Sequence, residues 1–252
     1  MRRRRLLGQH TLVDSNVVEA MVEAAELEGC EVVYEIGTGS GVLTRRLCSL
    51  AGKVVSCEVD EALYRVALSK LDAKNLKLIR GDGFDADVKF DVFISSLPYY
   101  CSSRFVKWLI GKKFNRAVVL LQKEFVQKLL AEVGGKYYRA ISVLAQYAFN
   151  ITPIRDVPPD AFTPKPKVQS TLVLITPKSN RSLSKEITQT IYKLFALRKK
   201  KVSTAFKMLV KNSKICALPI HPTLLAKRVA SLTPEEAVEL AKLLVDCFDG
   251  SL

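Results

Sequence analysis

Hydrophobic residues follow two alternating patterns along the first half of the chain: short continuous runs and stripes with helical spacing. The continuous runs occupy residues 31–37, 53–60, 76–82, 89–97 and 116–122. Stripes with helical spacing occupy residues 14–27, 41–52, 61–71, 102–111 and 123–134. Strands that are apolar on both faces and are separated by helical crossovers are typical of a parallel sheet covered by helices on both sides. The pattern therefore predicts a doubly wound α/β domain.

The first helical stripe also carries signals for its two ends. Asp14 or Ser15 is placed to cap the helix, and Gly29 is placed to end it. Five apolar residues share one face of this predicted helix: Val17, Val18, Met21, Val22 and Ala25. We expect that face to pack against the core.

The pattern changes after Asn150. Residues 151–177 are rich in proline and contain two extended segments around a long loop, and the alternating residues 168–175 favour an antiparallel edge strand. Beyond Pro177 only helical patterns follow, at 186–210, 222–232 and 233–248, the last with Thr233 at the N-cap and Pro234 at the first helical position. We predict a main domain over residues 1–178 and a small helical domain over residues 179–252.

Positive charge is concentrated in two places. The 252-residue chain has a formal net charge of +14, and residues 181–228 carry twelve Lys or Arg against one acid, Glu186. The densest segment is Arg198, Lys199, Lys200 and Lys201, and a second cluster is Arg2, Arg3, Arg4 and Arg5. A basic surface can serve solubility alone, but clustering of this kind favours nucleic-acid binding through phosphate contacts.

Several classes of protein are disfavoured by composition. No run of about 18 apolar residues predicts a membrane span, and the basic N-terminus lacks the apolar stretch of a secretory signal, so we expect a cytoplasmic protein. The six cysteines are scattered without a CxxC pair and are expected to be reduced and mostly buried. With only His10 and His221, a zinc site or a Ser-His-Asp triad would need an unusual arrangement, and we expect no metal.

A glycine-rich turn follows the first predicted strand. In "EIGTGSG", Gly37, Gly39 and Gly41 let the backbone turn sharply and approach a ligand closely. A tight turn without any ligand is the alternative. The spacing GxGxG differs from the GxGxxG of nicotinamide-cofactor sites, and no Lys-Ser or Lys-Thr follows as in a phosphate-binding P-loop.

Two carboxylates stand at the tips of the next two strands. Glu58 is placed to accept hydrogen bonds from both ribose hydroxyls of a nucleoside, and Asp82 to accept from an adenine amino group. Each acid alone could be a helix cap or a loop charge. Together, after a glycine turn, they describe an adenosine pocket, and S-adenosylmethionine is the cofactor that remains plausible.

The fourth strand ends in "SLPY", and its tip faces the same crevice. Ser96 can accept a hydrogen bond from an exocyclic amine. Pro98 restricts Leu97 to an extended conformation and contributes no donor, while Tyr99 offers a face on which an extruded base can stack. The alternative is a strand-ending turn with tyrosines in the core.

The order of these motifs resembles the KsgA/Dim family of small-subunit rRNA adenine dimethyltransferases, which is related to the Erm enzymes and the mitochondrial transcription factor B proteins. The resemblance covers nearly the whole chain and is carried by "LGQHTLVD", "EIGTGSG", "CEVD", "GD", "SLPYY", "LLQKEFVQKLLA", "YYRAISVLAQY", "VPPDAFTPKPKV" and "LFALRKKK". It implies a Rossmann-like class I methyltransferase domain with a mostly parallel seven-stranded sheet, followed by a small all-helical C-terminal domain.

The resemblance also implies a function. It implies transfer of methyl groups from S-adenosylmethionine to the exocyclic amines of two adjacent adenosines, in a hairpin loop near the 3′ end of small-subunit rRNA. The expected partner is this rRNA within an immature small ribosomal subunit, and we expect a monomer.

Matching motifs assign roles to individual residues. Gln9 and Leu12 would border the cofactor, Gly37 and Gly39 would approach its methionine part, and Glu58 and Asp82 would hold ribose and adenine. Glu35 and Ser96 complete the expected cofactor-binding set. The target adenine would be handled by Ser96, Leu97, Pro98 and Tyr99, with Phe162 as a second stacking ring, although a loop anchor in the core is the alternative for Phe162.

Three positions depart from the family pattern. Ser96 stands where Asn is usual, "QHT" at 9–11 replaces "QNF", and Tyr137-Tyr138 replaces "YG". Serine occurs at this position among other amino methyltransferases, but its shorter arm raises an alternative: a ribosome-assembly factor that binds the same rRNA with weak or no methyl transfer. A large-subunit rRNA methyltransferase of the Erm type and a small-molecule methyltransferase fit the motifs and the basic helices less well. His10 is expected to make a local hydrogen bond.

Overall fold

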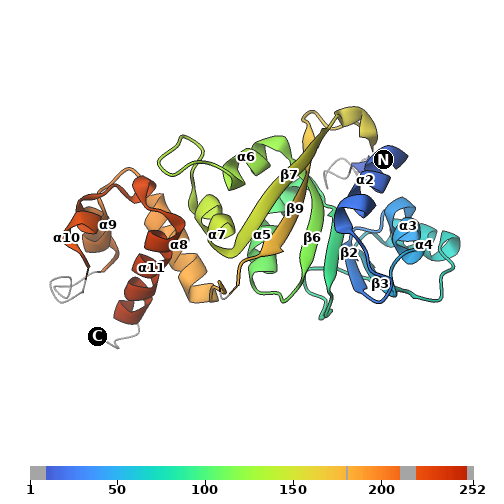
Figure 1. Cartoon of the computed structure of the whole chain (residues 1–252), viewed down its shortest axis with the longest axis horizontal. Coiled ribbons are helices and arrows are strands. Elements are labelled where there is room, and N and C mark those ends of the chain that lie inside the picture. Colours follow the sequence, from blue (N-terminus) through green and yellow to red (C-terminus); the bar gives the residue numbers. More distant parts are fainter. Residues whose placement is uncertain (1–9, 180, 211–219, 249–252) are drawn as a thin grey trace. The chain divides into compact units, whose positions relative to one another are not determined.

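The computed structural model describes residues 10–179, 181–210 and 220–248 (Figure 1). These residues form two compact units. The first comprises the chain up to Trp108, Lys112–Val126 and Asn150–Pro177, and the second comprises Leu109–Gly111, Gln127–Phe149 and the chain from Lys178 onward. The second unit thus includes a central segment as well as the C-terminal helices, and the boundary at residue 178 stays a prediction.

A seven-stranded sheet of mostly parallel strands forms the centre of the fold, as the sequence predicts. Its strand order is β4-β3-β2-β5-β6-β9-β7. Neighbours from β4 to β6 pair in parallel, whereas β9 pairs antiparallel with β6. The strands are β2 (Val32–Ile36), β3 (Lys53–Glu58), β4 (Leu76–Arg80), β5 (Val92–Ser96), β6 (Arg116–Gln122), β7 (Phe149–Val157) and β9 (Ser170–Pro177).

The position of β9 corrects one expectation. β9 is antiparallel as predicted, but it lies between β6 and β7 and is not at the edge of the sheet. Its first four residues, Ser170 to Val173, are all buried, which suits a strand with a neighbour on each side. A separate two-stranded ribbon joins β1 (Thr11–Leu12) to β8 (Phe162–Thr163) in antiparallel register.

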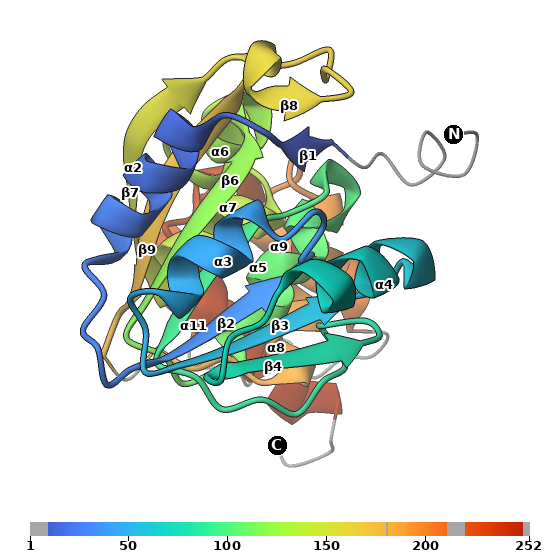
Figure 2. The ribbon, with the colours of Figure 1, turned by 90° about the vertical axis from the view of Figure 1, so that its right-hand side faces the viewer.

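Helices of the first unit lie along the sheet (Figure 2). On one side are α2 (Ser15–Ala25), α3 (Val42–Cys48) and α4 (Glu61–Lys70), which contact strands of the sheet. Because residues alternate between faces along a strand, Ile94 of β5 joins the cluster packed under α2 whereas Phe93 points to the opposite face. There Phe93 stacks on Phe105 of α5 (Ser102–Ile110), with ring centroids 5.2 Å apart.

Helix α2 matches its predicted face but not its predicted end. The five predicted apolar residues are all buried, and the Asp14 carboxylate accepts a hydrogen bond of 2.8 Å from the Asn16 amide as N-cap. The helix stops at Ala25, because Glu26 adopts a left-handed conformation with φ of 46°. The prediction that Gly29 ends the helix is therefore wrong.

The remaining helices include one that the periodicity missed. Helix α7 (Ala140–Ala148) is buried at eight of its nine residues, so it shows no alternation of polar and apolar faces. The pattern at 186–210 divides into α8 (Lys185–Ala196) and α9 (Val202–Leu209), and residues 197–201 connect them. The other elements are α6 (Lys123–Leu129), α10 (Pro222–Ala226), α11 (Pro234–Phe248) and the 3₁₀ turns Tyr99–Cys101, Pro159–Ala161 and Val229–Ser231.

The start of α11 is capped as predicted. The Glu236 amide donates to Thr233 Oγ1 at 3.2 Å, and the Thr233 amide donates to Glu236 Oε2 at 3.0 Å. These reciprocal bonds satisfy amides that have no partner inside the helix.

Cysteine burial is lower than expected. Of the five cysteines in the described ranges, only Cys57 and Cys101 are buried, and Cys216 lies outside those ranges. Within the same ranges, no helix has the length and apolar character needed to cross a membrane.

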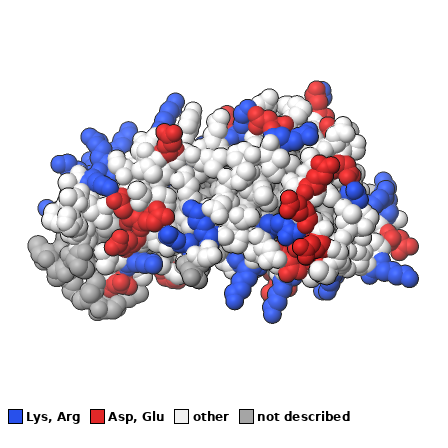
Figure 3. All heavy atoms as spheres, viewed as in Figure 1, with Lys and Arg blue, Asp and Glu red and all other residues white. Residues whose placement is uncertain are grey.

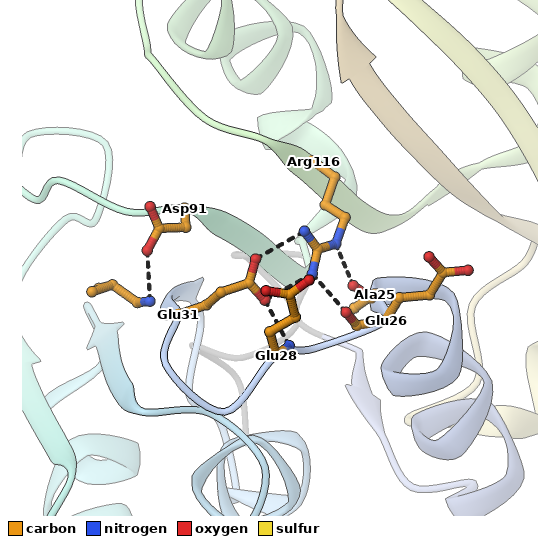
Figure 4. Close-up of polar contacts among 7 residues, drawn as sticks. Ala25, Glu26, Glu28, Glu31, Asp91 and Arg116 are labelled. Carbon is orange, nitrogen blue, oxygen red and sulfur yellow. Dashed lines mark hydrogen bonds and ion pairs between the residues drawn. The ribbon is translucent and has the colours of Figure 1, made fainter.

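An ion pair at the amino ends of β2 and β6 ties three chain segments together (Figure 4). The guanidinium of Arg116, at the start of β6, pairs with the Glu31 carboxylate at 2.7 and 2.9 Å. It also donates to the carbonyls of Ala25 and Glu26, at the end of α2. The side chains of Arg116 and Glu31 are only 18% and 9% exposed, so removal of one partner leaves the other charged group buried without compensation.

We predict that Arg116→Ala lowers the free energy of unfolding by about 3 kcal/mol. The variant leaves two helix-end carbonyls without this donor and leaves the buried Glu31 carboxylate with the Glu28 amide but no positive charge. Urea unfolding followed by circular dichroism measures this change. Arg65→Ala is the matched control, since the Arg65–Glu61 pair is exposed at 75% and 52% and such pairs contribute little. Equal stability of the two variants would contradict the prediction.

Candidate functional site

The carboxyl ends of β2, β3, β4 and β5 border one cleft of ≈ 190 Å³ in the first unit. This is the edge of a parallel α/β sheet at which ligands bind. The structure brings together in it most of the residues singled out from the sequence: Leu12, Glu35, Gly37, Gly39, Glu58, Asp82, Ser96 and Pro98. Gln9 and Arg2 to Arg5 lie outside the described residues.

The glycine turn forms one wall of the cleft. Gly37 and Gly39 have φ values of 91° and 58°, in the region that side-chain-bearing residues rarely adopt. A Cβ atom placed on Gly37 would meet nothing within 4 Å, so the backbone there is open to a ligand. The Gly39 amide donates to Glu58 Oε2 at 2.8 Å, which holds the turn against the tip of β3.

Glu58 is buried and retains acceptor capacity. The residue is only 3% exposed. Oε2 accepts from the Gly39 amide, and Oε1 accepts from the Asp60 amide at 2.9 Å. A carboxylate offers about four acceptor sites, so two protein donors leave capacity for the hydroxyl groups of a ribose.

Glu35 lies beneath the glycine turn in a network of hydroxyl groups. Its Oε2 atom accepts hydrogen bonds of 2.6 Å from Thr44 Oγ1 and from Ser56 Oγ. Ser56 Oγ also lies 2.6 Å from Thr38 Oγ1, a residue of the turn itself. Burial raises the pKa of Glu35 to about 7, against the opposing effect of the two hydroxyl donors. Its proton is therefore held near neutral pH.

The Asp82 carboxylate already has two partners. Oδ1 accepts from the Phe84 amide at 2.9 Å, and Oδ2 pairs with Arg104 at 2.5 Å. Arg104 also pairs with Asp85 at 2.8 Å, and its guanidinium carbon lies 4.7 Å from the centre of the Phe84 ring. Sequence reasoning missed Arg104, which lines the cleft and comes from α5, 22 residues after Asp82.

Tyr34 lies beneath the turn that follows β4. Sequence reasoning also missed it, because it has the pattern of a core residue in a buried strand. Its hydroxyl donates to the Gly83 carbonyl at 2.5 Å and lies 3.2 Å from Cys57 Sγ. A Cβ atom on Gly83 would lie 2.6 Å from Ile36 Cγ1 and 3.0 Å from the Tyr34 hydroxyl. The small residue at 83 thus makes room for the tyrosine, and burial raises the pKa of Tyr34 above its ordinary range.

The residues assigned to the target adenine surround a second, narrow pocket of ≈ 10 Å³. Its walls are His10, Ser96, Leu97, Pro98, Tyr99, Leu120 and Phe162. The Tyr99 hydroxyl lies 2.7 Å from Ser170 Oγ. Phe162 is 2% exposed within the hydrophobic core, so its burial matches the anchor alternative, although it lies in the same pocket as Tyr99. A purine needs more space than this pocket has.

His10 stands at the junction of the cleft and the narrow pocket and lines both. Its Nδ1 atom lies 2.6 Å from the Pro164 carbonyl oxygen, so the expected hydrogen bond is formed with a residue 154 positions away and not with a local one. Its ring centroid is 5.5 Å from that of Tyr99, at an interplanar angle of 36°. His10 therefore covers part of the Tyr99 face.

The basic segment 198–201 lies in the second unit. Lys199, Lys200 and Lys201 are exposed, whereas Arg198 is half-buried. Among the residues that the structure describes, no three His, Cys, Asp or Glu side chains group together as metal ligands would.

The sheet order, the glycine turn and the carboxylates at successive strand tips define a Rossmann-like methyltransferase fold. Two solved methyltransferase structures have a similar fold. A dimethyladenosine transferase from Plasmodium falciparum aligns with a TM-score of 0.79 at 27% identity over 96% of this chain and 99% of that one. The 23S rRNA methyltransferase ErmE shares the fold, with a TM-score of 0.66 at 23% identity over 93% of this chain and 99% of that one.

The family described as ribosomal RNA adenine dimethylase matches residues 1–246. A relative from Methanopyrus kandleri, named "Probable ribosomal RNA small subunit methyltransferase A", is 34% identical over 96% of this chain and 92% of its own length. One of the same name from Pyrococcus abyssi is 34% identical over 94% and 90%. The chain belongs to the ribosomal RNA adenine dimethylase family, which confirms the resemblance seen in its motifs.

The chain is accordingly an S-adenosylmethionine-dependent rRNA adenine dimethyltransferase. The cleft fits this cofactor on three observations. The Gly37 position is open where a Cβ would otherwise stand, Glu58 keeps free acceptor capacity, and Asp82 presents a carboxylate at the next strand tip.

We predict that Glu58→Gln weakens binding of S-adenosylhomocysteine at least about tenfold, because an amide replaces a charged acceptor already engaged by two backbone donors. Isothermal titration calorimetry measures the affinity. Glu61→Gln is the matched control, since Glu61 is a half-exposed acid on α4 that pairs with Arg65. An unchanged affinity in Glu58→Gln would exclude Glu58 from the cofactor site.

We predict that Glu35→Gln flattens the pH dependence of stability. The pKa of Glu35 is about 7 in the folded chain and 4.5 ordinarily, so the folded state holds this proton more tightly. The free energy of unfolding therefore falls as pH rises from about 4.5 to about 7, by on the order of 3 kcal/mol. Urea midpoints from pH 4 to 8 for both proteins measure the difference; parallel profiles would refute it.

Proposed function

We propose that the chain converts two adjacent adenosines, in a hairpin loop near the 3′ end of small-subunit rRNA, to N6,N6-dimethyladenosines during maturation of the small ribosomal subunit. The relatives that carry a small-subunit name support this choice of RNA, since they match over nearly their whole length. The observation that carries the proposal is the position of Ser96. Ser96 lines both the cofactor cleft and the narrow pocket, so a methyl donor and a target amine would meet at this residue.

The chemistry follows from the groups around Ser96. When bound, S-adenosylmethionine supplies a methyl group on a positively charged sulfur. The adenine N6 lone pair forms the new C–N bond as the C–S bond breaks, and the N6 proton leaves to water once the nitrogen is alkylated. Ser96 Oγ accepts a hydrogen bond from the amine and helps to localise the lone pair on N6. No strong base is required.

The base must leave its helix to reach this site. Tyr99 offers the stacking face, and its hydroxyl bond to Ser170 fixes the ring. Because Phe162 is buried and His10 covers part of Tyr99, entry of the base requires the narrow pocket to widen. We infer that the ribbon of β1 and β8, which carries Leu12 and Phe162, moves when the base enters.

The second unit would hold the RNA. Exposed Lys199, Lys200 and Lys201 are placed to contact phosphates, and release of counterions favours such binding. In this proposal the helical domain of residues 179–252 grips the rRNA, residues 1–178 perform the transfer, and the chain acts as a monomer.

The test is methylation of unmethylated small ribosomal subunits by the purified chain with labelled S-adenosylmethionine, with the modified nucleotides mapped by mass spectrometry. We expect two adjacent dimethyladenosines near the 3′ end of the rRNA. Tyr99→Ala should lower kcat at least about tenfold through loss of base stacking. No label on small-subunit rRNA, with label on large ribosomal subunits offered in a parallel reaction, would overturn the choice of substrate.

Ser96→Asn separates the enzyme from an assembly factor. If Ser96 is adequate for catalysis, the variant and the wild type dimethylate at similar rates. Binding of small subunits by the wild type without methyl transfer, restored by the Asn variant, would leave the assembly role alone.

A further inference from the structure

The loop between α6 and α7, residues 130–139, presents an aromatic ring to solvent among positive charges. Tyr137 is 48% exposed, although its neighbour Tyr138 is fully buried. The Lys136 ammonium lies 5.5 Å from the centre of the Tyr137 ring. Exposed aromatic rings beside Lys or Arg are the components with which proteins bind unpaired nucleotides.

Contacts inside the second unit hold this loop in place. The Tyr138 hydroxyl donates to the Leu232 carbonyl at 2.9 Å, and the ring of Tyr138 packs edge-on against Phe195 at 5.7 Å. Arg198 donates to the Gly135 carbonyl at 3.1 Å. Because both neighbours of Lys136–Tyr137 are anchored, the exposed ring is presented on a fixed backbone, which lowers the entropic cost of stacking a ligand on it.

Two guanidinium groups meet at the same loop. Arg139 donates to the carbonyls of Lys136 and Tyr138 at 2.6 and 2.9 Å. Arg198 donates to the carbonyl of Gly135, the residue before Lys136. Burial, and then the positive charge of Arg139, lowers the pKa of Arg198. In the described part of the chain, neither guanidinium is paired with a carboxylate.

Nearby acids do not offset this charge. Burial, and then the nearby charges of Glu235 and Glu236, raise the pKa of Tyr138. These two acids already pair with Arg181 and Lys227. Within the loop the one acid is the exposed Glu132. Figure 3 shows Lys and Arg side chains gathered over the loops at the α8–α9 end of this unit. A phosphate group would offset the repulsion between the two arginines.

We propose that Tyr137, Lys136, Arg139 and Arg198 form a binding site for an unpaired nucleotide of the rRNA, separate from the adenine that is methylated. The base stacks on the exposed face of Tyr137, and an adjoining phosphate lies by Arg139 and Arg198. The site extends the basic segment 198–201 across a second loop. This inference rests on the proposed rRNA substrate, but it concerns only how that RNA is held.

The test measures affinity of the full-length chain for unmethylated small-subunit rRNA and for large-subunit rRNA, by filter binding over a series of salt concentrations. Tyr137→Ala should weaken binding of the rRNA substrate about tenfold, and Tyr137→Phe should bind as the wild type does, because stacking needs the ring and not the hydroxyl. Lys136→Ala should also reduce the slope of log K against log salt by about one.

Matched controls separate the site from a general loss of charge or of fold. Lys242→Ala removes one exposed charge from α11, outside the loop, and should leave the affinity nearly unchanged. Thermal unfolding followed by circular dichroism reports the folding of both units independently of RNA, and it should be equal in all the variants.

The outcomes distinguish this inference from the proposed function. Wild-type affinity in Tyr137→Ala, or a loss in Tyr137→Phe as large as that in Tyr137→Ala, overturns the stacking site. Equal losses in Lys136→Ala and Lys242→Ala overturn its charge component. Methylation of large-subunit rRNA instead overturns the proposed substrate, and the Tyr137 comparison on that RNA then still decides the stacking site.

Discussion

The hydrogen bond from the Gly39 amide to the Glu58 carboxylate is the constraint on which the site depends. It joins the turn after β2 to the tip of β3, and the parallel register of these strands brings the two residues together. Only a residue that tolerates positive φ can direct this amide at the carboxylate. Glu58 keeps acceptor capacity on the side of the cleft, so one contact both shapes the glycine turn and positions the acid that we expect to bind the cofactor.

A second set of contacts links the cofactor site to the face of the sheet under α5. Tyr34 crosses beneath the turn after β4 and holds the Gly83 carbonyl, while Arg104 on α5 holds Asp82 from the other side. Helix α5 follows directly after the 3₁₀ turn of Tyr99–Cys101. The acid expected to recognise adenine and the segment expected to bind the target base are therefore connected through one short helix.

In the function we propose, chemistry takes place at the strand tips and electrostatic attraction of the RNA takes place in the second unit. The cleft is lined by glycine turns, three acids and small hydroxyls, a composition suited to a nucleoside cofactor and unsuited to holding long RNA. Loops of the second unit carry Lys136, Arg139 and the basic segment 198–201. Because phosphate attraction acts over several ångströms and stacking acts only on contact, charge can orient the RNA before the base is extruded.

The sequence by itself determined the strands from β2 to β6, the helices between them, the caps at Asp14 and Thr233 and the acids at the strand tips, because each depends on neighbours within a few residues. Only the tertiary structure decided the place of β9 inside the sheet and the existence of α7, whose residues are buried on all sides and show no period. It also decided the partners of Tyr34, Arg104 and Arg116, which lie 49, 22 and 85 residues away. Contacts over such separations arise from packing of the whole domain, so local patterns of polar and apolar residues do not predict them.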